Sequence, residues 1–186
     1  MSDLFELTLV LDLALSDAEA AELRWHLGQG PRPEGPAALT VPPAPARDGD
    51  DLRPADADTA LASDDAFYPA LDQRGLAARI GGHLFADLEP RGDGTWSLMC
   101  RQEVHPDAGE AIDPLVHGLA ARAVGGDTER TIGYLRFHED IHIGSAIIVR
   151  AGRPGLRPCG PRARGRDGRE PGGIRPFSVF PAEIIP

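Results

Sequence analysis

The strongest constraint on the fold is an alternation of residue types near the start of the chain, followed directly by a helix signal. Between residues 5 and 13 every odd position is apolar, and the even positions are mostly polar. A period of two predicts a half-buried strand. Ser16 and Glu19 then have the spacing of a capping box, in which each side chain accepts a hydrogen bond from the other residue's backbone amide. We therefore expect a strand followed by a helix over residues 16–27, which ends at Gly28.

The middle of the chain predicts two more strands and a second helix. Residues 78–90 and 95–104 alternate in the same way, and the Asp-Gly step between them favours a tight hairpin turn. Residues 114–124 have a helical pattern of apolar positions. Because proline lacks an amide and is tolerated at the first position of a helix, we expect Asp113 to be the N-cap and Pro114 to begin this helix.

The last strong strand signals lie in the stretch TIGYLRFHEDIHIGSAIIVR. Residues 131–137 alternate, and after an interruption near Asp140 a further strand covers residues 142–150. The order strand, helix, strand, strand, helix, strand predicts an α+β protein. Its fold class would be a ferredoxin-like β-α-β-β-α-β sandwich, an antiparallel sheet with two helices on one face, with an additional C-terminal strand.

Composition divides the chain into a folded part and two irregular parts. Residues 1–150 are predicted to form a single α+β domain, with a flexible insertion at about 28–65 that is rich in Pro, Ala, Asp and Gly and has no periodicity. Residues 151–186 are rich in Arg, Gly and Pro. They are predicted to be a disordered tail with a short apolar end.

The charge of the chain argues against several partners. Residues 1–149 carry a net charge of −15 and residues 150–186 a net charge of +5, which together give −10. An acidic body repels phosphate backbones, so we expect no nucleic-acid binding by the main domain. The apolar run near the start contains acidic residues and has no basic flank, so it predicts neither a signal peptide nor a membrane span. We expect a cytoplasmic protein.

One short match to a catalytic motif occurs at His138–His142, which reads HEDIH. It resembles the H-E-x-x-H motif of zinc proteases, where a helix places two histidines on one face so that both bind zinc, and the glutamate polarises a water. Here the preceding residues alternate with period two, and no histidine follows His142. We therefore interpret HEDIH as a strand end, with His138 and His142 as weak metal-ligand candidates, and we expect no cofactor.

The side of the sheet away from the two helices is the best candidate for a binding surface. The predicted alternation places six polar or aromatic candidates there: His83, Arg101, Glu103, Tyr134, Arg136 and His138. The function that we expect is binding to a protein partner or a second copy, through this face or an acidic surface. The alternative is a small-molecule-binding or enzymatic domain, such as a metal-dependent hydrolase that uses His138 and His142. No catalytic residue is assigned.

Overall fold

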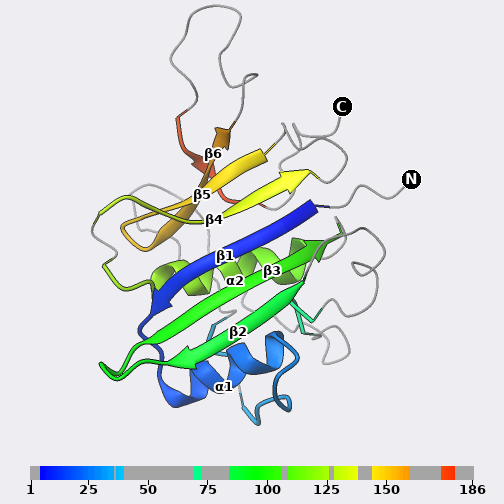
Figure 1. Ribbon diagram of the computed structural model, residues 1–186, viewed down its shortest axis with the longest axis vertical. Coiled ribbons are helices and arrows are strands. Elements are labelled where there is room, and N and C mark those ends of the chain that lie inside the picture. The colour runs from blue at the N-terminus through cyan, green and yellow to red at the C-terminus, as the bar shows by residue number, and fades with distance from the viewer. Residues whose placement is uncertain are drawn as a thin grey trace, which may run out of the picture.

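In the part of the chain that the structure describes, the fold is built on one large antiparallel sheet with two helices (Figure 1). The computed structural model describes residues 5–35, 37–39, 69–72, 84–105, 109–125, 128–137, 144–159 and 173–178. The strands are β1 (Phe5–Leu13), β2 (Phe85–Pro90), β3 (Trp96–Val104), β4 (Arg130–Phe137), β5 (Gly144–Arg150), β6 (Arg153–Cys159) and β7 (Arg175–Pro176). The helices are α1 (Asp17–His26) and α2 (Gly109–Ala121). In the sheet the strands lie in the order β2-β3-β1-β4-β5-β6-β7.

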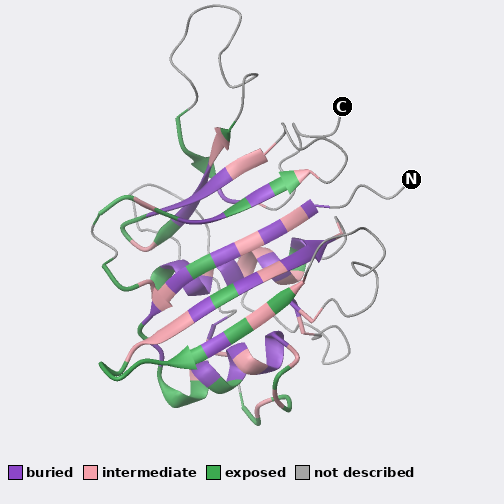
Figure 2. Cartoon of the chain, in the orientation of Figure 1, coloured by how far each residue is buried: buried purple, intermediate pink, exposed green. Residues whose placement is uncertain are grey.

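β1 lies inside the sheet, and its alternation defines the two faces. It pairs with β3 along its whole length and with β4 over its first half. Leu7, Leu9 and Leu13 are fully buried, whereas Val10 is half exposed. Buried and more exposed residues therefore alternate along β1 and in the middle of β3 (Figure 2), as predicted for a sheet with one covered face. At the end of β3, Gln102, Glu103 and Val104 are all buried.

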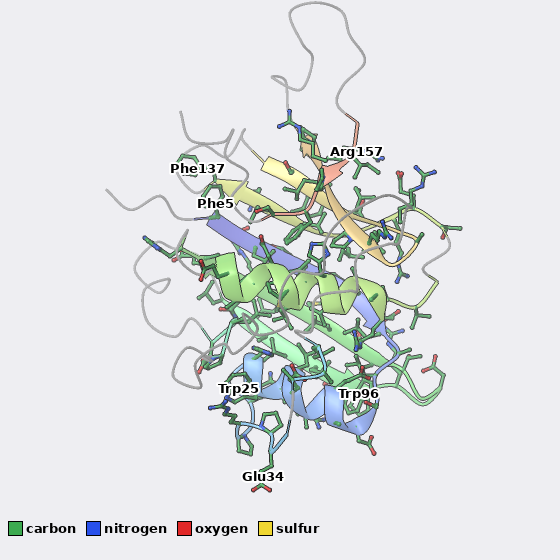
Figure 3. The ribbon with its side chains drawn as sticks, turned by 180° about the vertical axis from the view of Figure 1, so that it is seen from behind. Phe5, Trp25, Glu34, Trp96, Phe137 and Arg157 are labelled. Carbon is green, nitrogen blue, oxygen red and sulfur yellow. The ribbon has the colours of Figure 1, made fainter. Side chains whose placement is uncertain are left out.

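Both helices lie behind the sheet as it is seen in Figure 1, and Figure 3 shows them from that side. α2 contributes a fully buried stripe that includes Ile112, Leu115 and Leu119, the spacing of one helix face. α1 begins with the predicted capping box: the Ser16 hydroxyl accepts a hydrogen bond from the Glu19 amide at 3.4 Å, and the Glu19 carboxylate accepts one from the Ser16 amide at 2.8 Å. Neither helix is long and apolar enough to cross a membrane.

The predicted fold class is wrong. A ferredoxin-like sandwich with one additional strand would have five strands, whereas the sheet has seven. β6 and β7 both lie in the region that composition assigned to a tail. Their pairing is regular, since β6 pairs with β5 along all seven residues after a two-residue turn at Ala151 and Gly152. The folded part therefore continues past residue 150.

The composition of β6 explains why this strand was not predicted. Its sequence, RPGLRPC, contains two prolines and a glycine, which are typical of loops. However, Pro154 and Pro158 are four residues apart. Alternate residues of a strand direct their amides to opposite edges, so the two prolines remove donors from one edge only. The other edge keeps its donors, and the strand can pair.

The start of α2 also differs from the prediction. The helix begins at Gly109, not at Pro114, and Pro114 lies inside it. An internal proline removes one helical hydrogen bond, at a cost of about 3 kcal/mol. The additional turn places Ile112 in the core with no exposed surface. Complete burial of an isoleucine contributes roughly 2–3 kcal/mol, which offsets most of that cost.

Two parts of the region between α1 and β2 are held against α1. The amides of Ala38 and Leu39 donate to Glu22 Oε2 at 2.5 and 3.1 Å, and Leu39 is fully buried. Further along, the amide of Ala70 donates to Nδ1 of His26 at 3.2 Å. Of the insertion predicted at 28–65, residue 36 and residues 40–65 lie outside the described residues.

Candidate functional site

The candidate site is the open face, by which we mean the side of the sheet that faces away from α2. The strand register assigns four of the six predicted residues to this face: Arg101 and Glu103 on β3, and Tyr134 and Arg136 on β4. His83 and His138 lie outside the described residues, as does the second weak metal candidate, His142.

Glu6 is the centre of the polar part of the open face. Its Oε2 accepts a hydrogen bond from Nη2 of Arg101 at 2.5 Å, and its Oε1 accepts one from Nη2 of Arg136 at 2.6 Å. Three strands meet here, because Glu6 belongs to β1 and lies directly opposite Glu103 on one side and Arg136 on the other. One carboxylate therefore fixes the position of two guanidinium groups.

The two arginines keep Glu6 ionised. Partial burial raises the pKa of Glu6, but the hydrogen bonds and positive charges of Arg101 and Arg136 outweigh it and hold the pKa below its ordinary value. The Glu6 side chain is 15% exposed, whereas Arg101 and Arg136 are 30% and 46% exposed. The carboxylate is thus largely enclosed, and the guanidinium groups remain accessible from solvent.

Large apolar side chains form a continuous strip beside this polar cluster. Val10 and Met99 are directly opposite each other on β1 and β3, and they are 51% and 47% exposed. Tyr134, 49% exposed, lies opposite Thr8 and therefore diagonal to Val10. Phe85 on β2, 37% exposed, is diagonal to Met99 in the same way. Diagonal neighbours on a sheet are within reach of long side chains, so the four residues form one surface.

The β5–β6 side of the open face is more closed. Ala146 and Ile148 belong to this face by register, yet they are 7% and 2% exposed. Gly155 lies opposite Ile148, and a side chain there would collide with Ile174. On the same side Arg157 donates to Glu129 at 2.6 Å. The exposed apolar strip is therefore confined to β2, β3, β1 and β4.

Glu6 was not among the predicted site residues, although a signal for it was present. Like Val10 and Asp12, it occupies an even position of β1, and even positions lie on the open face. What the alternation does not give is the register between strands, which brings Glu6 next to arginines 95 and 130 residues away. Asp12 has a similar partner from the β2–β3 turn, Nη2 of Arg91 at 3.0 Å.

The open face offers charged hydrogen-bond donors and apolar area. Among the described residues, no group of three or more His, Cys, Asp or Glu side chains is arranged to hold a metal ion. The accessible groups of the polar cluster are the two arginines, whose planar donors suit carboxylates and carbonyl oxygens. Tyr134, two residues before Arg136 on β4, adds a phenol to the same face.

Replacing Glu6 with glutamine is expected to make the protein less stable at neutral pH, by roughly 1 kcal/mol for partly exposed ion pairs. Because the pKa of Glu6 is lowered in the folded state, its contribution is present above the unfolded value of 4.5 and is lost as the pH falls through the folded value. Urea unfolding of both proteins at pH 7 and pH 3 measures this. An equal difference in stability at both pH values would contradict it.

The chain has no recognisable relative in three comparisons: no protein-family model, no curated protein and no solved structure matches it. We therefore infer the function of the chain from the chemistry of its open face.

Proposed function

We propose that the chain acts by binding a protein partner through the open face of its sheet. The observation that carries the proposal is the strip of Phe85, Met99, Val10 and Tyr134, which adjoins the arginines held by Glu6. An antiparallel sheet with one solvated face normally presents polar residues there. Single exposed apolar residues are common on protein surfaces, but a contiguous group is typical of an interaction site.

The residue types of the open face also favour a protein partner. Tyrosine and arginine are enriched among the residues that contribute most to protein–protein affinity. Arg101 and Arg136 are already positioned by Glu6, so less conformational entropy is lost when they meet a partner. The matching surface would have an apolar centre, with carboxylates or carbonyl oxygens beside it.

The state of Glu6 favours binding over acid–base catalysis. A general base or acid works best with a pKa near the working pH. Since the pKa of Glu6 is lowered and both of its oxygens accept hydrogen bonds from arginines, this carboxylate is a weak proton acceptor at pH 7. Its role in the proposal is to orient the arginines.

The proposal predicts that charge placed in the apolar strip abolishes partner binding. The variant Met99→Glu with Tyr134→Glu puts two carboxylates into the strip, and Val124→Glu is the control, since Val124 is 37% exposed beyond the end of α2. A partner isolated by cross-linking is purified and titrated against each protein. We expect the affinity to fall at least about tenfold for the double variant, which is ~1.4 kcal/mol or more, and to be unchanged for the control. Equal affinity for all three proteins would contradict the proposal.

A further inference from the structure

The charges of the open face are divided between its two halves. Among the described residues, the half formed by β2, β3 and β1 has five carboxylates on its strands (Glu6, Asp12, Asp87, Glu89 and Glu103). Against these stand Arg101 and the ion-pair partner of Asp12, Arg91, which gives a net charge of −3. Within the described ranges, the half formed by β4, β5 and β6 has a net charge of +3, from four arginines (Arg136, Arg150, Arg153 and Arg157) against Glu129, the ion-pair partner of Arg157. The face is therefore complementary to itself.

Four of these charges are not neutralised within the described part of the chain. Asp87 and Glu89 on β2, and Arg150 and Arg153 on the β5–β6 hairpin, are exposed and make no ion pair there. The uncompensated carboxylates thus lie near one edge of the face, and the uncompensated arginines lie near the opposite edge.

The two groups also lie at the same level along the strands. Phe85 and Arg157 lie in the row that contains Thr8 and Tyr134. From that row, Glu89 is four residues along β2, and Arg153 is four residues along β6. The strand registers show that both displacements, from Phe85 to Glu89 and from Arg157 to Arg153, run in the direction in which β1 runs from Thr8 to Asp12.

A twofold axis parallel to the strands, between β1 and β4, relates these features. Such an axis places β2 of one copy over β6 of the other and leaves the level along the strands unchanged. Glu89 then faces Arg153 twice, as an isologous interface requires. The same operation preserves the twist of the sheet, so the two faces stay parallel in the aligned packing of two sheets. An axis across the strands would instead place halves of like charge together.

We infer that the partner of the open face is a second copy of this chain, packed face to face about a twofold axis parallel to β1. This inference rests on the proposed function, since it names the occupant of the same surface. The axis passes beside Val10 and Tyr134, so these two residues lie at the centre of the interface. Met99 and Phe85 lie toward its edge, over β5 and β6 of the second copy, where Ile174 lies against Gly155. The uncompensated charges pair at its two edges.

The size of the face suits a stable dimer. Six strands about 4.8 Å apart, of six to nine residues at 3.4 Å per residue, give a face of roughly 25 by 20 to 30 Å. The upper end of that range approaches the ~800 Å² per partner that specific protein interfaces bury.

Charge reversal at the two edges tests the inference. The full chain is purified, and its association is measured by sedimentation velocity over a range of concentrations. We expect a dimer for the wild type and a dissociation constant raised roughly tenfold by Glu89→Arg or by Arg153→Glu alone, because like charges then meet at both edges. The double variant should recover to within about threefold of the wild type, since each reversed pair is again complementary. The control Glu34→Arg, outside the face, should not change association.

The outcomes separate this inference from the proposed function. A monomer at every concentration overturns the inference, but the proposed function stands if a different purified partner loses binding in the Met99→Glu and Tyr134→Glu variant. A dimer that none of the open-face variants weakens also overturns it, because the copies then meet elsewhere. If the chain is monomeric and no partner depends on the strip, both proposals fail. Thermal unfolding of each variant verifies that the chain is folded before association is measured.

Discussion

Replacing Gly133 with alanine is expected to separate β1 from β4 and to lower the free energy of unfolding by about 3 kcal/mol or more. The register of β4 against β5 shifts between Thr131 and Gly133, and Gly133 lies unusually close to the backbone of β1. A Cβ atom there would collide with the carbonyl oxygen of Thr8 and would lie 3.1 Å from Cα of Leu9. Because these are backbone atoms of the neighbouring strand, a rotamer change cannot relieve the collision.

The measurement is urea unfolding of Gly133→Ala beside the control Gly92→Ala. Gly92 lies in the β2–β3 turn, and a Cβ atom there has no other atom within 4 Å. The control should therefore differ from the wild type by less than about 0.5 kcal/mol, as exposed substitutions usually do. Loss of the β1–β4 seam should also weaken the contact between Glu6 and Arg136, which crosses it. Equal stability of both variants would mean that the strands can adjust to a side chain at this position.

The irregularity at Gly133 also shows the limit of a periodic pattern. Alternation placed Ile132 on the same face as Tyr134 and Arg136. The register shift instead turns Ile132 into the core, where it is 1% exposed, and leaves Thr131 exposed. Alternation with a period of two predicts which face of the sheet a side chain lies on only while the strand is regular. Beyond a bulge, the same positions lie on the opposite face.

Local signals were sufficient where the structure depends on neighbouring residues. The alternation of residues 5–13 and the capping box at Ser16 and Glu19 define β1 and the start of α1, because both patterns act within a few residues. β6 and the first turn of α2 could not be obtained in this way. Proline and glycine disfavour both elements locally, and they form because β5 pairs with β6 and because the core accommodates Ile112.

The open face could be predicted as a surface but not as an arrangement. The alternation of positions along each strand was enough to place Arg101, Tyr134 and Arg136 on one side of the sheet. That Glu6 binds both arginines depends on β3 and β4 flanking β1 in one particular register. The same register aligns Glu89 with Arg153 at opposite edges. The division of charge therefore becomes visible only in three dimensions.

The buried carboxylate of Glu22 provides the second large expected effect. It lies on α1 and is 2% exposed, and sequence pattern alone would place a glutamate of a short amphipathic helix in solvent. Burial raises the pKa of Glu22, but the nearby imidazole of His26, whose Nε2 lies 3.8 Å from Glu22 Oε1, and hydrogen bonds from the amides of Ala38 and Leu39 outweigh it, and the pKa lies below its ordinary value. Glu22 is therefore ionised, and its carboxylate holds residues 37–39 against α1.

Replacing Glu22 with alanine is expected to lower the free energy of unfolding by about 3 kcal/mol or more, since two backbone amides lose their acceptor in the interior. Glu22→Gln keeps an acceptor oxygen and should lose roughly 1 kcal/mol. The control is Glu34→Ala, which removes a carboxylate that is exposed beyond α1 (Figure 3).

Amide hydrogen exchange by NMR distinguishes local from global loss in the Glu22→Ala variant. In the wild type the amides of Ala38 and Leu39 should be protected, because both donate to Glu22. In the variant they should exchange faster than the amides of β1, which lies at the centre of the core and opens only with global unfolding. Unchanged protection at Ala38 and Leu39 would show that packing of Leu39, whose carbonyl lies against Gly118, holds the segment without the carboxylate. The segment would then be fixed by shape, and the burial of Glu22 would be a consequence of its docking, not the cause.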